Sequence, residues 1–123
     1  MADQPPICVV DDDESLRRSI DGLLRSAGYT VVQFEDADSF LAAQSLSDLK
    51  CVISDIHMPG EHDGVALATR LLTEAPHIRV ILISAFLDKK GEADVRASGI
   101  YAFLRKPFDG NALLDLVDIA VVG

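Results

Sequence analysis

Five polar residues of the 123-residue chain could together bind a metal ion and a phosphoryl group: Asp11, Asp12, Asp55, Ser84 and Lys106. Each of them ends or closely follows a short apolar run. Three carboxylates and one ammonium leave a local charge of about −2, and such crowding raises at least one carboxylate pKa unless a cation binds. Ligands that offer only oxygen favour Mg²⁺ (or Mn²⁺), which takes one or two carboxylates together with phosphate oxygens.

These residue types predict a role for each member of the set. We expect Asp12 and Asp55 to be direct metal ligands and Asp11 to act through water. An oxygen of the Asp55 carboxylate can then attack an activated phosphoryl group and form an aspartyl-phosphate. Phosphoryl transfer needs neutralised equatorial oxygens, and the metal, Lys106 and Ser84 would each contact one. The backbone N–H groups that follow Asp55 and Ser84 complete the expected phosphate contacts: Ile56, His57 and Ala85.

Each of these residues also has an ordinary structural explanation. Acidic residues after a strand often cap the next helix, and for Asp13 a cap is as good an explanation as a site. A lone Asp55 would be a loop residue, and Ser84 would be a turn former. The joint arrangement favours the site, because each group follows its own predicted strand. A glycine-rich phosphate loop of the kind that binds nucleotides is absent after the first strand, where the sequence is acidic.

The elements that position these residues can be predicted from the apolar pattern. Continuous apolar, β-branched runs at 7–10, 31–34, 51–54, 80–84 and 101–104 are typical of strands buried on both faces. Between them, apolar residues at helical spacing predict helices near 16–27, 37–44, 67–72 and 113–120. Gly28 and Pro76 are predicted stops, and Asp109 is a predicted cap. Segment 88–98 has few apolar residues, so its helix should be thinly anchored.

Strands that alternate with helices predict an α/β fold with a doubly wound parallel sheet. We expect the flavodoxin-like (βα)5 arrangement with strand order 2-1-3-4-5. Strands 1 and 3 are then neighbours, and ligands bind at their carboxyl ends. This topology brings the five polar residues to one edge of one sheet.

The overall composition indicates one soluble globular domain over residues 1–123. The chain is 49% hydrophobic and 25% charged, and we expect neither a membrane span nor a secretion leader. The net charge of −9 and the scattered basic residues argue against direct binding of nucleic acid. Cys8 and Cys51 lie inside apolar runs, so reduced, buried thiols and a cytoplasmic location are expected.

Four segments resemble the receiver domain of two-component response regulators: 9–14 (VVDDDE), 54–59 (SDIHMP), 83–85 (ISA) and 103–108 (FLRKPF). Together they cover the chain from near residue 6 to its end. The resemblance implies that Asp55 accepts a phosphoryl group from a histidine kinase or a histidine phosphotransfer protein. It also implies that the backbone carbonyl of His57 completes the metal shell, and that Ser84 and Phe103 form a switch pair.

The resemblance implies a signalling protein rather than an enzyme with free substrates. A receiver catalyses only its own phosphorylation and the hydrolysis of its aspartyl-phosphate. Its output would pass through the fourth helix, fifth strand and fifth helix to an output domain or a partner protein, and a phosphorylation-dependent dimer is left open. The sequence departs from the family at residues 60–63, where the loop is one residue longer than usual.

Three alternatives compete with this interpretation. A haloacid-dehalogenase-like phosphohydrolase also uses an aspartate nucleophile, but it carries a second acid two residues later, where this chain has His57. A receiver that only docks is disfavoured because the acidic residues are retained. A zinc site from His57 and His62, with Asp55 or Glu61 as third ligand, has weak support in the spacing. We further expect the His57 side chain to edge the site and to tune the access of water.

Overall fold

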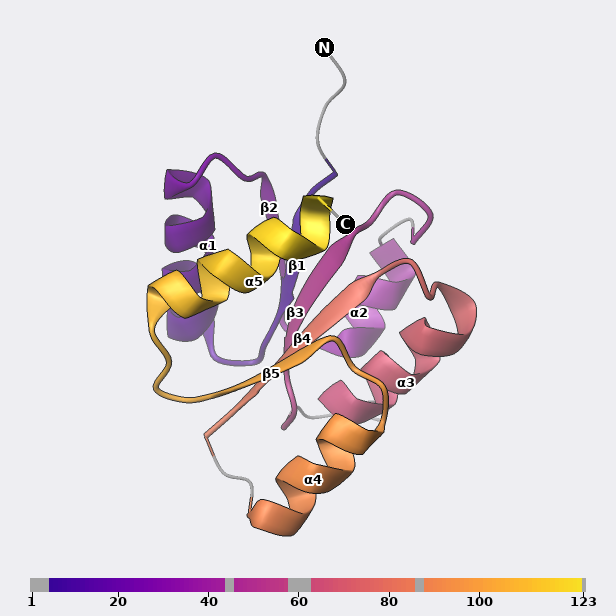
Figure 1. Ribbon diagram of the computed structural model, residues 1–123. Coiled ribbons are helices and arrows are strands. Elements are labelled where there is room, and N and C mark those ends of the chain that lie inside the picture. Colours follow the sequence, from indigo (N-terminus) through magenta and orange to yellow (C-terminus); the bar gives the residue numbers. More distant parts are fainter. Residues whose placement is uncertain (1–4, 44–45, 58–62, 86–87, 123) are drawn as a thin grey trace.

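The computed structural model describes residues 5–43, 46–57, 63–85 and 88–122. Strands and helices alternate along the chain: β1 (Ile7–Val10), α1 (Glu14–Ser26), β2 (Val31–Phe34), α2 (Ala37–Ala43), β3 (Cys51–Asp55), α3 (Gly64–Glu74), β4 (Arg79–Ser84), α4 (Lys89–Ala97), β5 (Ala102–Arg105) and α5 (Gly110–Val122). The strands are parallel and form one sheet in the order β2-β1-β3-β4-β5 (Figure 1). The predicted α/β class and the flavodoxin-like strand order are confirmed.

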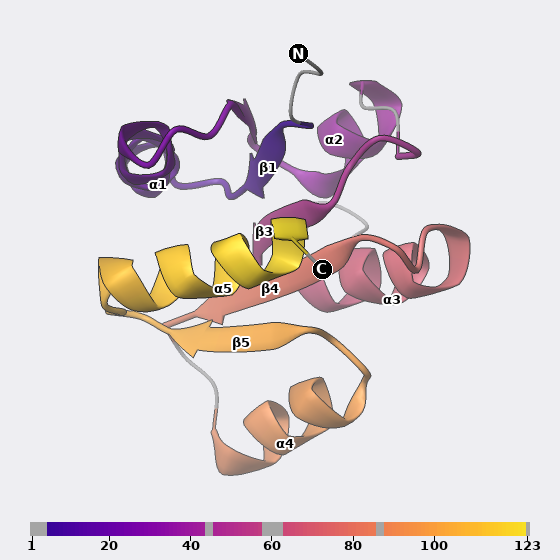
Figure 2. The same ribbon diagram turned by 45° about the horizontal axis from the view of Figure 1, so that its top comes forward.

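Helices cover both faces of the sheet. α1 and α5 lie on one face, and α2, α3 and α4 lie on the other (Figure 2). Consecutive strand residues enter the two layers alternately, so Val9 packs with α1 and α5 while Val10 packs on the opposite side. All four residues of β1 are buried. This two-sided burial explains why the strands are continuous apolar runs.

The two cysteines lie on opposite faces of the sheet. Cys8 belongs to the core beneath α2 and α3, and Cys51 to the core beneath α1 and α5. Both thiols are free and buried, and burial raises the pKa of each to about 12. Their placement on opposite faces agrees with the expectation of reduced thiols.

Side-chain caps begin the helices that lead away from the sheet edge. Asp13 Oδ1 accepts the Leu16 N–H at 3.3 Å, so the cap that was one of two explanations for Asp13 is present. Asp109 likewise accepts the N–H of Asn111 at 2.9 Å. At the other end of α1, Gly28 has a φ of 96°, which glycine adopts without a Cβ clash. The predicted stop of this helix is therefore correct.

Three strands differ by one residue from the apolar runs at one or both ends. β3 extends to Asp55, β4 begins at Arg79, and β5 runs from Ala102 to Arg105 rather than over 101–104. Polar residues end an apolar run in the sequence, but their backbones continue the ladder, as in the pairing of Ser84 with Arg105. The predicted second helix ran to Gln44, which lies outside the described residues, and α2 ends at Ala43.

α4 is the most thinly anchored helix, as its composition predicts. Val95 is its one buried residue. A polar contact adds to this packing, because Glu92 accepts a hydrogen bond from Arg105 of β5 at 2.5 Å; within α4 it also accepts one from Arg96 at 3.0 Å. These hydrogen bonds from Arg105 and Arg96 hold the pKa of Glu92 below its usual range.

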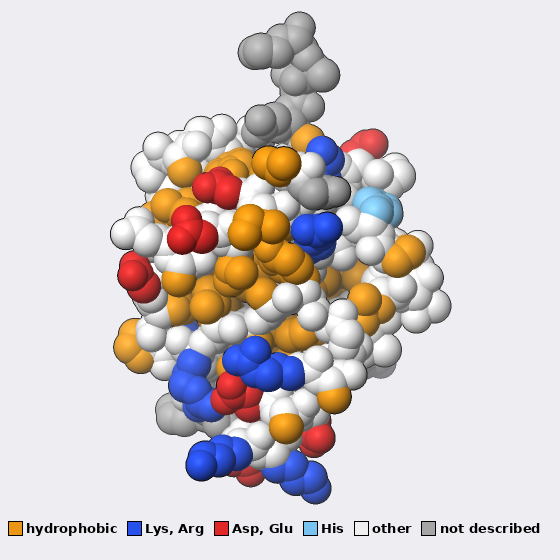
Figure 3. Space-filling model, viewed as in Figure 1, with side chains coloured by type: hydrophobic (Ala, Val, Ile, Leu, Met, Phe, Trp, Pro, Cys, Tyr) orange, Lys and Arg blue, Asp and Glu red, His pale blue; other side chains and the backbone are white. Residues whose placement is uncertain are grey.

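Apolar side chains form a band over α5 and β5 on the face seen in Figure 3, with Lys and Arg side chains gathered over α4. A shallow hollow of about 470 Å³ lies in this region, and Phe103, Leu116 and Ile119 are among its lining residues. Ile119 is 58% exposed. Within the described ranges, every helix is too short or too polar to cross a membrane.

Candidate functional site

The carboxyl ends of four strands bring the predicted polar residues together. Asp11 follows β1 and continues its pairing, since its N–H donates to the Phe34 carbonyl at 3.0 Å. Asp55 is the last residue of β3 and Ser84 the last of β4. Lys106 follows β5 directly, and its N–H donates to the Ser84 carbonyl at 2.8 Å. The backbone hydrogen bonds of the sheet therefore fix the Cα positions of these residues.

Three carboxylates share one small volume at this edge. Asp11, Asp12 and Asp55 each offer an oxygen, and these oxygens all lie within 4.8 Å of one another. Asp11 is fully buried, Asp55 is 7% exposed and Asp12 is exposed. The cluster thus opens to the surface on the Asp12 side.

Lys106 supplies the positive charge of the site. Its Nζ lies 3.0 Å from Asp55 Oδ2 and 3.6 Å from Asp11 Oδ2. Partial burial alone would lower the pKa of Lys106, but the hydrogen bond to Asp55 and the attraction of Asp11 outweigh burial and raise this pKa. The ammonium therefore stays protonated between two carboxylates.

Asp11 carries the electrostatic strain of the cluster. Burial raises the pKa of its carboxyl to about 6, and the charge of Asp55 adds to this rise. The Asp13 N–H donates to Asp11 Oδ1 at 2.9 Å. Asp11 Oδ2 is buried and has no hydrogen-bond partner among the residues that the structure describes. Its ion pair with the Lys106 ammonium spans 3.6 Å, which is beyond hydrogen-bond distance, so a bound cation would supply further positive charge to this buried oxygen.

This donor set fits a hard divalent cation. The three clustered ligand residues offer carboxylate oxygens, which Mg²⁺ and Mn²⁺ prefer. The zinc alternative gains no support within the described part of the chain. His57 is exposed, and His62 and Glu61 lie outside the described residues, as do residues 60–62 of the predicted longer loop.

The start of α3 packs tightly against the strand that carries Asp55. The Gly64 N–H donates to the Ile56 carbonyl at 2.8 Å. A Cβ on Gly64 would lie 2.8 Å from Ile56 Cα and 2.9 Å from the Asp55 carbonyl carbon, and closer still to the Asp55 carbonyl oxygen. Only glycine allows this approach, so Gly64 helps to set the position of Asp55.

Two of the three backbone N–H groups expected to face a phosphoryl group already have partners. The His57 N–H donates to Asp55 Oδ1 at 3.0 Å, within the site. The Ile56 N–H donates to the Ile83 carbonyl at 2.9 Å and extends the β3–β4 ladder, so the expectation for Ile56 is corrected: this N–H serves the sheet. Ala85 is exposed beside Lys106.

The residues of the predicted switch pair are both buried. Ser84 is fully buried at the end of β4. Phe103 is 7% exposed and packs in the core that also contains Val95 of α4. The guanidinium of Arg96, also on α4, lies 5.6 Å from the centre of the Phe103 ring. Phe103 therefore connects β5 to the thinly anchored helix.

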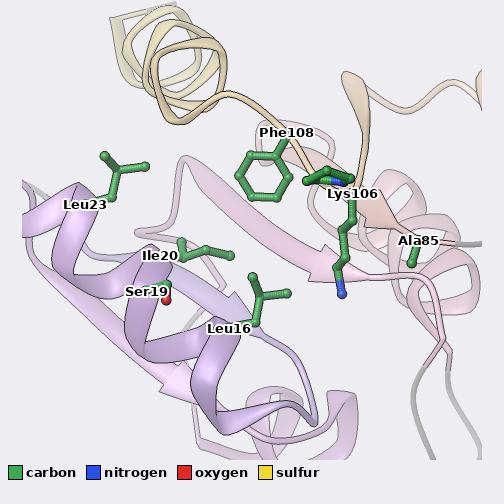
Figure 4. Close-up of a pocket in the computed structure, with 8 residues that line it drawn as sticks. Leu16, Ser19, Ile20, Leu23, Ala85, Lys106 and Phe108 are labelled. Carbon is green, nitrogen blue, oxygen red and sulfur yellow. The ribbon is translucent and has the colours of Figure 1, made fainter.

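An apolar groove of about 480 Å³ borders the site between α1 and the segment after β5 (Figure 4). Leu16, Ile20 and Leu23 of α1 form one wall, and Pro107 and Phe108 form the other. The Lys106 ammonium points away from the Phe108 ring in this view, and the same ammonium pairs with Asp55, so Lys106 belongs to both the groove and the site. The Lys106–Pro107 peptide bond is cis.

Sequence reasoning missed two residues that contact the site backbone. Arg17 Nη1 donates to the Asp11 carbonyl at 2.6 Å, and Gly64 packs on Asp55. The position of Gly64 directly after the helix cap Asp63 is the only sequence signal for its role. Nothing in the sequence distinguishes Arg17 from its neighbour Arg18.

Known proteins are similar to this chain in sequence and fold. The family model for the response regulator receiver domain matches residues 7–118. The transcriptional regulatory protein FixJ of Bradyrhizobium diazoefficiens is 34% identical over 115 residues, covering 94% of this chain and 56% of that protein. The DNA-binding transcriptional regulator NtrC of Salmonella typhimurium is 35% identical over 115 residues, covering 94% of this chain and 24% of that protein.

A solved structure is similar over nearly its whole length. The receiver domain of NtrX from Brucella abortus superimposes with a TM-score of 0.85 at 31% identity, covering 94% of this chain and 98% of that one. The chain spans about half the length of FixJ and about a quarter of NtrC. The chain belongs to the family of response regulator receiver domains.

Proposed function

We propose that residues 1–123 form one receiver domain that accepts a phosphoryl group on Asp55. Phosphoryl acceptance is typical of the family. The observation that carries the assignment to Asp55 is its position: its Oδ2 receives the Lys106 ammonium at 3.0 Å, inside a cluster of three carboxylates. Asp55 is neither sealed off like Asp11 nor fully exposed like Asp12.

The carboxylates are proposed to hold Mg²⁺ (or Mn²⁺). Asp12 and Asp55 would be direct ligands together with the His57 carbonyl, and Asp11 would act through water. When bound, such an ion neutralises negative charge on the phosphoryl oxygens. The buried Asp11 Oδ2 supports this assignment: within the described residues it accepts no hydrogen bond and meets Lys106 only at 3.6 Å, and a cation would offset the repulsion within the cluster.

The chain's own groups then perform the transfer. An Asp55 carboxylate oxygen bonds to the donor phosphorus, the P–N bond of a phosphohistidine breaks, and its electron pair stays on the imidazole nitrogen. Lys106, kept protonated by its two carboxylates, turns to a phosphoryl oxygen. Ser84 and the N–H groups of His57 and Ala85 are the other proposed donors. Attack of water on the phosphorus later breaks the P–O bond to Asp55, releases inorganic phosphate and restores the carboxylate.

The proposed donor is a histidine kinase or a histidine phosphotransfer protein. The apolar groove lined by α1, Pro107 and Phe108 also includes Lys106, which contacts Asp55, so the groove lies beside the proposed acceptor. A protein that presents its phosphohistidine from an apolar helical surface would cover this groove. No contact with nucleic acid or membrane is proposed for this chain, which carries a net charge of −9. A cytoplasmic location is proposed, in keeping with the two free thiols.

The proposed output face consists of α4, β5 and α5. Phosphorylation adds nearly two negative charges beside Ser84 and Lys106. We propose that Ser84 moves toward the phosphoryl group and that Phe103, which packs under α4, follows and shifts the equilibrium of that helix. An output domain, an effector protein or a second copy of the chain would respond at the apolar band of Figure 3.

The test is a phosphotransfer assay with Mg²⁺. The natural chain and Asp55→Asn are each incubated with a small phosphoryl donor such as acetyl phosphate, with and without Mg²⁺, and their intact masses are measured. We expect one phosphoryl group on the natural chain only, and only with the metal. Equal labelling of Asp55→Asn would refute the assignment, and steady turnover of a soluble phosphate monoester would favour a phosphohydrolase.

A further inference from the structure

Arg17 of α1 reaches back to the backbone of the acidic turn. Its Nη1 donates to the Asp11 carbonyl oxygen at 2.6 Å, a short charge-assisted hydrogen bond. Its Nε donates to Gln33 Oε1 of the edge strand β2 at 3.3 Å. The guanidinium is therefore held between the turn after β1 and the neighbouring strand.

A polar chain continues from Arg17 along the sheet edge. Gln33 Nε2 donates to Asp21 Oδ2 at 2.7 Å, and Asp21 pairs with Arg25. Arg25 in turn donates to the Val31 carbonyl at 2.8 Å, at the start of β2. These bonds link two turns of α1 to β2, so the orientation of Arg17 is fixed by its neighbours.

The bond from Arg17 fixes the peptide that leads to Asp12. The Asp11 carbonyl and the Asp12 N–H belong to one planar peptide unit, so holding the carbonyl helps to place the Asp12 N and Cα, from which its side chain starts. The Asp11 N–H is already bound to Phe34, and Asp11 Oδ1 to the Asp13 N–H. The exposed Asp12 carboxylate has no hydrogen bond or ion pair of its own within the described ranges. Its placement therefore depends on the backbone.

We propose that Arg17 is a positioning residue for the divalent-cation site, acting through the Asp11–Asp12 peptide and without touching the ion. This inference rests on the proposed function, because it assigns a role at the same acidic cluster. Groups that hold metal ligands in place typically change metal affinity by about tenfold to a hundredfold when removed.

A positioning role and a purely electrostatic role of Arg17 predict opposite changes in Mg²⁺ affinity when Arg17 is replaced. A positive guanidinium near the cluster repels a divalent cation, so removing its charge alone would tighten Mg²⁺ binding. If Arg17 acts by holding the peptide, its removal weakens Mg²⁺ binding despite the lost repulsion. A purely structural role would lower the stability of the metal-free protein and leave the affinity of the folded protein unchanged.

The experiment is isothermal titration calorimetry of Mg²⁺ into the full chain, with circular dichroism to verify that each variant is folded. Arg17→Met should weaken binding by about tenfold or more. Arg18→Met is the matched control, since it removes the same charge from the next residue. The Arg18 side chain is 74% exposed and pairs with Glu14 at 3.0 Å rather than with the Asp11 carbonyl. Its Mg²⁺ affinity should stay within about twofold of the natural value.

A second variant, which keeps the net charge, tests the inference if Arg17→Met does not fold. Gln33→Met removes the acceptor of Arg17 Nε, and it should weaken Mg²⁺ binding by roughly threefold to tenfold, less than loss of the arginine itself. The inference is overturned if folded Arg17→Met binds Mg²⁺ as tightly as the natural chain or more tightly. If Arg17→Met is unfolded, unchanged Mg²⁺ binding by Gln33→Met overturns it. Neither result would contradict the proposed metal site itself. Absence of Mg²⁺ binding by the natural chain would instead overturn the proposed function.

Discussion

Replacing Gly64 with alanine tests whether the start of α3 holds Asp55 in place. The added Cβ would lie 2.8 Å from Ile56 Cα and 2.9 Å from the Asp55 carbonyl carbon. Ordinary contacts begin near about 3.5 Å, so the two backbones must separate by roughly 1 Å when the still closer carbonyl oxygen is included. Every atom in the conflict belongs to the backbone, so no side-chain rotation can relieve it.

Two opposing terms determine the stability of Gly64→Ala. Forcing extra volume into a packed site costs about 1–3 kcal/mol. Alanine offsets up to about 1 kcal/mol of this cost through its higher helix propensity. Because the clash is with backbone, we take the upper end of the first term and expect a net loss of about 2 kcal/mol in the free energy of unfolding. Urea unfolding measures this difference.

The same displacement should slow phosphorylation. A misplacement of about 1 Å at a reacting group can cost about a hundredfold in rate, so the initial rate with acetyl phosphate and Mg²⁺ should fall by about tenfold to a hundredfold. Gly22→Ala is the control, because Gly22 is an exposed residue of α1 and its added Cβ would meet nothing within 4 Å. It should gain up to about 1 kcal/mol and keep the natural rate. Gly64→Ala with natural stability and natural rate would refute the reasoning.

Asp11→Asn should raise the free energy of unfolding of the metal-free protein at neutral pH by on the order of 1–3 kcal/mol, because burial raises the pKa of Asp11 to about 6. The folded state holds this proton more tightly than the unfolded chain, so the stability of the natural protein relative to Asp11→Asn falls as the pH rises from about 4 to about 6. Glu92→Gln should speed amide exchange across α4, because Arg105 loses its acceptor. The hydrogen bond from Arg105 lowers the pKa of Glu92, so the natural protein should keep its slow exchange above the ordinary glutamate pKa. That slow exchange should be lost as the pH falls through the lowered pKa. Cys8 and Cys51 should resist a thiol reagent until the protein unfolds, because burial raises their pKa to about 12.

Each of these expectations has a result that would contradict it. A less stable Asp11→Asn at neutral pH would mean that the buried carboxylate is not a source of strain. Glu92→Gln is compared with Asp94→Asn, which removes a charge from an exposed position of the same helix. Equal exchange in the two variants would assign no specific role to Glu92. Rapid modification of either thiol in the folded protein would contradict its burial.

The fold was predictable because its signals are local. Continuous apolar runs identify strands buried on both faces, and alternation with helices leaves few topologies. The same rule misplaced the ends of β3, β4 and β5, since Asp55, Arg79 and Arg105 are polar yet pair in the ladder. A polar residue in the sequence indicates that its side chain is not part of the apolar core, but the strand continues for as long as its backbone forms ladder hydrogen bonds.

The clustering of the acidic residues and Lys106 was predictable, whereas the residues that support this cluster were less so. The topology brings Asp11, Asp55 and Lys106 to one sheet edge, as their positions after the strands imply. The contacts of Arg17 and Gly64 depend on distances between segments that the sequence does not encode locally. The Ile56 N–H was wrongly expected to be available, because the added β3–β4 pairing depends on register.

The most direct test of the central proposal is to locate the acyl phosphate chemically. After phosphorylation with Mg²⁺, borohydride reduces an aspartyl-phosphate to homoserine, and tryptic cleavage after Lys50 and Arg70 releases residues 51–70 as one peptide. Tandem mass spectrometry should then find homoserine at position 55 and nowhere else. Homoserine at position 11 or 12, or a fully phosphorylated protein with an unchanged 51–70 peptide, would contradict the proposal that Asp55 accepts the phosphoryl group.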